Sequence, residues 1–599
     1  MPYFLNQYHV GAYRSAAAGL KVQAWFFHFL AAPPGRSGQR RRGETICKIK
    51  ERSPKPMSKP STRQSILLAA LTLLLALLLS GCSGSATSTG GPAPSGSQGT
   101  TIAELKLPAE DWGLPTPFTF YPRGPGYLHL SFVYDTLLWK NDKEVIPWLA
   151  QEWQVSPDQL TWTFKLRPGI KWQDGQSLTA RDVVFTFDYL GKNNFEWAKF
   201  DMIDNISAPD EQTVVFKLKK PFVPFMQQIA GNVPIIPQHV WQNIQDPRKE
   251  ARPELCVGSG PYRLVSYDKS QGTYEYTANK DFFLGEPRVK KLLFVPASDK
   301  VAALEKGDIH AGDIPASLLA RFEQDKRFKV LSGAAFWVLK LQFNMDKEPF
   351  NQPAVRQAVA FAINRQELIE KAVPGGLKGA KPGNPGFLPP ESDWFDQQYY
   401  DLYPYDINKA KELLQQAGIA DRDNDGIAED KKGQKMQFTL LAPQQYSREA
   451  ENIKLMLKEA GLALDLKLVN IKAIDNLVKS KQFDLAVNGH GGLGGDPSMI
   501  MGFGVARGGI RTPGTPESPA YLQVAQKLLV TPDETQRRAL ASRMQKMYAQ
   551  ELPCLPLYYP VWYFAYNPQV FDGWFYTCKG GIGIGIPMLY NKLAFVGGK

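Results

Sequence analysis

Four acidic side chains within nine residues have the types and the spacing of a calcium-binding loop. Residues 421–429 read DRDNDGIAE, with acidic groups at the first, third, fifth and ninth positions and a turn-forming glycine at the sixth. The twelfth position, normally a bidentate glutamate, is Lys432. A structural calcium ion and a solvated acidic turn both remain open. The oxygen ligands of such an ion would come from Asp421, Asp423, Asp425, the backbone carbonyl of Ile427, and Glu429.

The residue patterns of common catalytic sites are missing from the sequence. There is no GxSxG, HExxH or P-loop pattern, and no CxxC pair or Cys/His cluster that would hold zinc. We therefore expect a protein that catalyses no reaction and requires no cofactor.

One cysteine is placed for a different chemistry, the attachment of a lipid. Residues 66–79 (ILLAALTLLLALLL) are almost entirely apolar, two basic residues precede them, and LSGC follows at residues 79–82. The run is too short to span a bilayer and fits the apolar region of a secretion signal. The tetrad resembles the bacterial lipobox, whose cysteine is acylated. We predict a lipoprotein signal peptide at residues 57–81 and lipidation of Cys82.

The first 56 residues do not fit in front of a signal peptide, because such signals begin close to their own N-terminus. We predict that Met57 is the true start and that residues 1–56 are a mis-called extension. Without the eight excess positive charges of residues 1–56 and the two of residues 57–81, the net charge falls from +12 to +2. This charge balance does not indicate the basic face that nucleic-acid binding needs.

A Gly-, Ser- and Pro-rich stretch at residues 82–101 is predicted to be a flexible tether. The body that follows contains no further apolar run of membrane-spanning length. Its cysteines are Cys256, Cys554 and Cys578. An oxidising exterior allows Cys554 to pair with Cys578, but the spacing does not decide this.

Both helices and strands are expected in the body of the chain, which predicts a mixed α/β fold. Residues 161–166 (TWTFKL) alternate as a strand does. Residues 408–417 keep a helical period and end at Gly418, so the acidic loop connects this helix to a strand at residues 436–441. Residues 465–469 and 483–487 are again strand-like.

A series of short motifs in the body resembles the family 5 extracellular solute-binding proteins of bacterial ABC importers, the peptide- and nickel-binding group. The motifs occur in the family's order over nearly all of the mature chain. They are YDTLL (134–138), PWLA (147–150), SPD (156–158), FKLRPG (164–169), WQDG (172–175), TARDV (179–183), GSGPY (258–262), FN (343–344), VRQA (355–358), AIN (362–364), YD (405–406), FD (483–484) and DP (496–497).

The resemblance implies a two-lobed fold of the periplasmic-binding-protein type that closes like a clam, with an extra inserted domain. Lobe I would combine residues 102–140, 258–338 and 567–599, the inserted domain residues 141–257, and lobe III residues 339–566. Most motif residues are expected to be scaffold. The glycines of GSGPY would set turn dihedrals, and Arg167, Asp182 and Arg356 would form salt bridges.

Candidate ligand contacts come from three segments. Peptide binders of this family hold the ligand's ammonium group with an aspartate in a GWxxD-like tract. Here the tract is GHGGLGGDP (489–497), in which Leu493 falls at that position. Asp496 could substitute for it or could be a turn residue before Pro497. His490 is expected to form hydrogen bonds rather than bind nickel. The other candidates are Gln444, Gln445 and Tyr446 on one loop and Tyr121 and Tyr127 on another.

The function that the resemblance implies is capture of a ligand, an oligopeptide by preference, for delivery to an ABC permease driven by a separate ATPase subunit. A neutral solute such as an oligosaccharide, and a ligand-sensing receptor without transport, remain alternatives. The protein would lie on the outer face of the cytoplasmic membrane, held there by its lipid alone, and would bind no nucleic acid.

Overall fold

The computed structural model of the chain describes residues 101–141, 143–334, 336–500, 515, 517–575 and 591–596. All of them belong to one compact unit, residues 88–599. The predicted signal peptide, Cys82 and Cys578 lie outside the described residues. Cys554 is a buried free thiol. In the part of the chain that the structure describes, no helix has the length and apolar character needed to cross a membrane.

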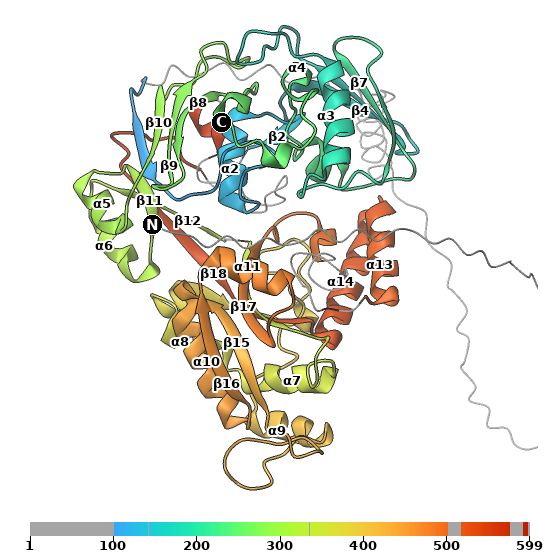
Figure 1. Cartoon of the computed structure of the whole chain (residues 1–599), viewed down its shortest axis with the longest axis vertical. Coiled ribbons are helices and arrows are strands. Elements are labelled where there is room, and N and C mark those ends of the chain that lie inside the picture. Colours follow the sequence, from blue (N-terminus) through green and yellow to red (C-terminus); the bar gives the residue numbers. More distant parts are fainter. Residues whose placement is uncertain are drawn as a thin grey trace, which may run out of the picture. The chain divides into compact units, whose positions relative to one another are not determined.

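A four-stranded sheet in the order β1-β10-β9-β8 is the centre of the N-terminal lobe (Figure 1). β1 runs parallel to β10, and the other neighbours are antiparallel. The sheet therefore joins a strand near residue 105 to strands that follow residue 260. Its strands are β1 (Leu105–Pro108), β8 (Tyr262–Asp268), β9 (Thr273–Ala278) and β10 (Lys291–Val295), and helix α2 (Gly124–Val133) lies against β8.

A second four-stranded sheet, in the order β4-β5-β7-β6, is formed by the residues between those two segments. The predicted strand at residues 161–166 is confirmed as β5, in which Trp162, Phe164 and Leu166 are buried in alternation. The strands of this second sheet are β4 (Ala150–Val155), β5 (Thr161–Leu166), β6 (Ile203–Ser207) and β7 (Thr213–Leu218). The same region contains the helices α3 (Ala180–Asn193) and α4 (Gln238–Trp241) and the hairpin of β2 (Leu138–Lys140) and β3 (Val145–Pro147).

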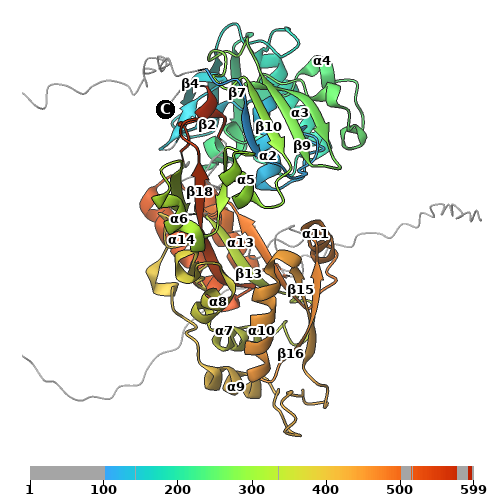
Figure 2. The same cartoon turned by 90° about the vertical axis from the view of Figure 1, so that its left-hand side faces the viewer.

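An eight-stranded sheet is the centre of the C-terminal lobe (Figure 2). Its main order is β11-β18-β13-β17-β15-β16, and β12 and β14 also pair with the long strand β18. The predicted boundary between residues 338 and 339 falls inside β13, which pairs with β17 on one side and β18 on the other. The strands are β11 (Ala311–Ile314), β12 (Lys329–Ala334), β13 (Trp337–Phe343), β14 (Ala380–Pro382), β15 (Gln437–Pro443), β16 (Ala463–Val469), β17 (Leu485–Gly491) and β18 (Cys554–Tyr566).

Helices pack on this sheet and around it. The predicted helix at residues 408–417 is confirmed as α9, and Gly418 after it has a φ of +85°, which suits a helix end. The predicted strands near residues 436, 465 and 483 are confirmed as β15, β16 and β17. The helices are α5 (Lys300–Lys306), α6 (Leu319–Gln324), α7 (Pro353–Ala362), α8 (Arg365–Ala372), α9 (Ile407–Gln416), α10 (Ser447–Glu459), α11 (Ile471–Lys479), α13 (Pro519–Val530) and α14 (Glu534–Glu551).

Several sequence motifs meet at one fully buried carboxylate, that of Asp135 in YDTLL. It accepts hydrogen bonds from Trp148 Nε1 of PWLA (2.7 Å), Ser259 Oγ of GSGPY (2.8 Å) and Lys592 Nζ (2.5 Å). A buried charge needs this degree of pairing, because removal from water is otherwise costly. The motifs are therefore scaffold, as expected.

The reason for the glycines of GSGPY is different from the one expected. Neither Gly258 nor Gly260 has a positive φ. Instead, a Cβ on Gly258 would collide with the carbonyl oxygen of Val133, and a Cβ on Gly260 with those of Phe132 and Val133. These glycines allow two backbone segments to approach each other closely.

The three charged motif residues are also scaffold, but they bind mainly backbone rather than salt-bridge partners. Arg356 is fully buried and forms a long ion pair with Glu551, at 3.6 Å. The backbone contacts are Arg167 Nε to the carbonyl of Trp148 (2.7 Å), the amide of Gln238 to Asp182 Oδ1 (3.0 Å), and Arg356 to the carbonyl of Phe350 (2.7 Å).

Candidate functional site: where the two lobes meet

Charged and aromatic side chains of both lobes make contact at one place, which we call the lobe-bridging cluster. Its N-terminal-lobe members lie on the segment before α2, and its C-terminal-lobe members lie on α11. The cluster consists of Asp111, Tyr121, Arg123, Lys472 and Asp475.

Asp475 receives two groups from the opposite lobe. The guanidinium of Arg123 donates to both of its carboxylate oxygens, at 3.1 Å and 2.5 Å. The hydroxyl of Tyr121 donates to Oδ2 at 2.6 Å. The side chains of Arg123 and Asp475 are 18% and 30% exposed, so the pair is shielded from water but not buried. Such a bidentate pair is both stronger and more directional than a single contact.

A second ion pair of the cluster has the opposite polarity. Lys472 of α11 donates to Asp111 Oδ2 at 2.7 Å, and the hydroxyl of Tyr267 donates to the other oxygen at 2.6 Å. The ammonium of Lys472 also lies 5.3 Å from the ring centre of Tyr121. Each lobe therefore offers one anion and one cation to the other.

The surroundings of Asp111 and Arg123 favour the charged form of each side chain. Burial alone would raise the pKa of Asp111, but hydrogen bonds from Lys472 and Tyr267 hold it below its usual value. Burial would likewise lower the pKa of Arg123, but Asp475 more than offsets this and raises it. Burial, and then Asp475, raises the pKa of Tyr121, which stays a neutral donor.

Aromatic rings of the C-terminal lobe lie next to this cluster. Arg123 also donates to the carbonyl of Gly489 on β17, at 3.4 Å. The indole of Trp337 covers Gly489 so closely that a Cβ there would collide with the ring. The ring centre of Tyr446 is 6.3 Å from that of Trp337, and burial raises the pKa of the Tyr446 hydroxyl. A ligand between the lobes would meet rings and an arginine here.

The region of the second four-stranded sheet also touches the C-terminal lobe. Gln228 Nε2 donates to Ser498 Oγ at 3.1 Å, and the amide of Val223 donates to the carbonyl of Leu529 on α13 at 2.8 Å. These contacts are neutral, in contrast to those of the lobe-bridging cluster.

Some of the predicted ligand-contact residues lie in or near the lobe-bridging cluster. Tyr121 belongs to the lobe-bridging cluster, and Tyr446 lies half-buried beside Trp337. Gln444 and Gln445 are exposed on the same short 3-10 turn as Tyr446. His490 follows Gly489 on β17, opposite Val338 of β13. That these residues contact a ligand stays a prediction.

Two other candidates, Tyr127 and Leu493, are placed inside the protein. Tyr127 is 2% exposed, stacks on Trp197 and donates to the carbonyl of Asn232 at 2.7 Å. Leu493 is 1% exposed, and its amide donates to the carbonyl of Phe336 at 3.0 Å. In this conformation neither side chain offers surface to a ligand.

Asp496 is committed to a partner within its own lobe. Its carboxylate forms an ion pair with Arg537 of α14, in which the side chains are 9% and 4% exposed. Oδ1 also accepts from the amide of Ser498 at 3.0 Å. A ligand ammonium would have to displace a buried guanidinium, so we do not retain Asp496, Leu493 or Tyr127 among the proposed contacts.

Sequence reasoning missed Arg123, Asp475 and Trp337. Arg123 lies between the two tyrosines that were singled out, and an arginine in a Gly/Pro-rich loop with aromatics could have signalled it. No feature of the sequence pointed to Asp475, because an acidic residue on an amphipathic helix usually faces solvent and has no further role.

One group of acidic side chains in the described part of the chain is close enough to hold a metal ion. It is the predicted calcium loop, in which the carboxylates of Asp421, Asp423, Asp425 and Glu429 come together.

Known proteins resemble this chain along most of its described length. The sequence profile of the "Bacterial extracellular solute-binding proteins, family 5 Middle" matches residues 144–509. An ABC transporter peptide-binding protein of Brucella ovis is 34% identical over 305 residues, which are 49% of this chain and 56% of that protein. The chain thus spans little more than half the length of that relative.

Two further relatives have solved structures. The oligopeptide-binding protein AppA of Bacillus subtilis is 26% identical over 467 residues, 74% of this chain and 81% of AppA. Its structure with a nonapeptide superimposes with a TM-score of 0.68, at 22% identity, over 78% of this chain and 95% of AppA. The substrate-binding protein CtaP of Listeria monocytogenes gives 0.64 at 25% identity, over 78% and 94%. The fold is the two-lobed periplasmic-binding type, as predicted.

Proposed function

Because the chain belongs to the bacterial extracellular solute-binding proteins of family 5, we propose that it captures an oligopeptide between its lobes and delivers it to the permease of an ABC importer. The observation that carries this proposal is the lobe-bridging cluster, in which each lobe presents one anion and one cation to the other. Contacts of this kind exist only when the lobes are together, so they favour the closed state.

The chain itself supplies binding rather than catalysis. A separate ATPase subunit would provide the energy, in line with the absence of a P-loop pattern from this sequence. The alternative to a transport function is a receptor that signals the presence of ligand to a partner protein and takes no part in transport.

The ligand class is supported by the relatives, two of which are named as peptide-binding proteins. The arrangement of acidic groups suggests how a peptide would be held. Asp475 and Asp111 are paired across the lobes, and Asp496 is paired with Arg537. We therefore propose that the cleft holds peptide backbone by hydrogen bonds rather than the terminal ammonium by a carboxylate.

A neutral solute such as an oligosaccharide is the second candidate. The same pairing of acidic groups favours it, and the rings of Tyr121, Trp337 and Tyr446 would stack on a sugar. Amides of Gln444 and Gln445 would suit its hydroxyl groups.

Mass spectrometry of whatever co-purifies with the protein tests the ligand class. We expect peptides of mixed sequence, and N-acetylation of one of them should change its affinity by less than about threefold. A loss of about a hundredfold or more on acetylation would instead indicate a carboxylate that pairs with the ammonium. A bound glycan would overturn the peptide proposal.

Anchoring by a lipid at Cys82 is part of the proposed function, since a receptor of this kind must stay near its permease. Its support is the LSGC tetrad after the apolar run at residues 66–79. Metabolic labelling with a radioactive fatty acid should mark the protein and should fail for Cys82→Ala. A labelled Cys82→Ala protein, or mature protein that begins at Met1, would contradict the anchor.

A further inference from the structure

The acidic loop between α9 and β15 is closed into a compact ring by backbone contacts. Ala420 and Glu429 form an antiparallel bridge, with hydrogen bonds of 3.0 Å and 2.9 Å in the two directions. Inside the ring, the amide of Gly426, which has a φ of +89°, donates to Asp421 Oδ2 at 3.0 Å. The loop is also tied to the neighbouring turn, where the amide of Ala428 donates to the carbonyl of Gly461 at 2.8 Å.

The side chains of the loop converge on one point. One oxygen from each of four carboxylates lies within 4.8 Å of all the others. Two oxygens on opposite sides of a calcium ion, at 2.3–2.6 Å from it, are separated by about 4.6–5.2 Å. The observed span therefore fits a single central calcium ion. These carboxylates belong to Asp421, Asp423, Asp425 and Glu429.

Glu429 gives an independent indication of a bound cation. Its side chain is 6% exposed, and Oε2 accepts a hydrogen bond from the amide of Arg422 at 2.9 Å. Its other oxygen, Oε1, is buried and has no hydrogen-bond partner among the residues that the structure describes. A buried carboxylate oxygen without a partner is costly, and a cation in the ring would remove that cost.

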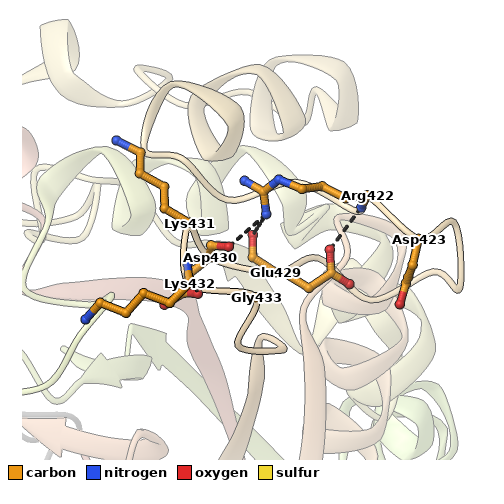
Figure 3. Close-up of a pocket in the computed structure, with 7 residues that line it drawn as sticks. All are labelled: Arg422, Asp423, Glu429, Asp430, Lys431, Lys432 and Gly433. Atoms are coloured by element: carbon orange, nitrogen blue, oxygen red, sulfur yellow. Dashed lines mark hydrogen bonds between the residues drawn. The ribbon is translucent and has the colours of Figure 1, made fainter.

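Two basic side chains, those of Arg422 and Lys435, contact the loop. Figure 3 shows the guanidinium of Arg422 turned back over the chain, where it donates to the carbonyls of Glu429 and Asp430 at 2.8 Å each. Lys435 forms ion pairs with Asp425 and Asp423 at the exposed side. Its ammonium is the group that an entering cation would displace.

We propose that this loop binds one Ca²⁺ ion, with the buried carboxylate of Glu429 as the anchor that replaces the usual ligand at the twelfth position. The three exposed aspartates and the carbonyl of Ile427 complete an all-oxygen site, and water would fill the remaining positions. A mixture of flexible carboxylates and water suits calcium better than magnesium, which demands a small octahedral site. Sites of this kind in extracellular proteins bind with dissociation constants of roughly 0.1–1 mM.

The ion would stiffen a part of the C-terminal lobe away from the ligand. In both views α9, which leads into the loop, lies at the end of the lobe opposite α11 (Figures 1 and 2). Calcium should therefore change stability and leave ligand affinity unchanged, which separates this proposal from the proposed function.

The test is the melting temperature of the purified protein in calcium, in magnesium and in chelator. Calcium should raise it, with saturation between about 0.1 and 10 mM, because an ion that binds only the folded state stabilises it by mass action. Glu429→Gln and the exposed Asp423→Ala, which removes a ligand oxygen, should each abolish the rise. Lys435→Gln should shift the midpoint to lower calcium, by about threefold or more.

A matched control is Asp430→Asn, because Asp430 is a neighbouring acidic residue outside the group of four carboxylates. Its side chain accepts hydrogen bonds from the amides of Lys432 and Gln434. The calcium response of this variant should persist. The proposal is overturned if wild type melts identically in calcium and chelator, if magnesium acts as well as calcium, or if Asp430→Asn loses the response to the same extent as Glu429→Gln.

Discussion

At the scale of single residues, His129 is an ionisable group that the fold holds neutral. It lies on α2, 3% exposed, with its ring centre 4.0 Å from that of Tyr274 and 4.4 Å from that of Phe294. Its Nδ1 lies 2.9 Å from the hydroxyl oxygen of Tyr276. Burial lowers the pKa of His129 to about 3. The surrounding tyrosines do not titrate in acid, so His129 alone responds at this position.

This burial predicts acid sensitivity. The unfolded chain binds a proton at His129 below about pH 6.5, while the folded protein does so only near pH 3. Between these values the unfolded state holds more protons, so the free energy of unfolding falls as the pH falls, by about 1.4 kcal/mol per unit for this one group. Urea unfolding between pH 7 and pH 5 should show a shallower loss for His129→Gln than for wild type.

The control for this prediction is His239→Gln, because His239 is partly exposed and pairs with Asp174 at 2.6 Å. Its pH profile should retain the His129 contribution to the slope. Equal slopes for wild type and His129→Gln would show that His129 is not the responsible group.

At the scale of elements, the sequence predicted the helices and strands that have a clear periodic pattern of apolar residues within their own segment. The alternation in β5 and the helical period of α9 were enough to place both within a residue. The parallel pairing of β15 with β16 and β17, and the joining of β1 to β10 across almost two hundred residues, were not visible, because long-range pairing leaves no local pattern. The acidic loop was visible because its ligands are close in sequence.

The candidate site was predictable only in part for the same reason. Tyr121 and Tyr446 were chosen for their ring chemistry, and both lie where the lobes meet. Asp496 was chosen for its charge, but α14, which supplies Arg537 as its partner, is about forty residues further along the chain. The alignment of charges across the lobes depends on folded geometry, so Asp475 could not be chosen from sequence.

At the scale of the whole molecule, the lobe-bridging cluster would give the proposed receptor a means of adjusting its ligand affinity. The two ion pairs are partly exposed, and such pairs contribute up to about 1 kcal/mol each. This is small enough for the lobes to separate and large enough to bias them toward closure. A ligand that binds only the closed form would gain the same amount in affinity.

The central claim, capture of ligand by closure of the two lobes, is tested most directly by calorimetric titration of the co-purifying ligand into wild type, Asp475→Ala and Lys479→Ala. Asp475→Ala removes the partner of Arg123 and Tyr121, and affinity should fall roughly fivefold, which corresponds to about 1 kcal/mol. Lys479→Ala, an exposed change on the same helix, should bind as wild type does. Unchanged affinity in Asp475→Ala would contradict the account.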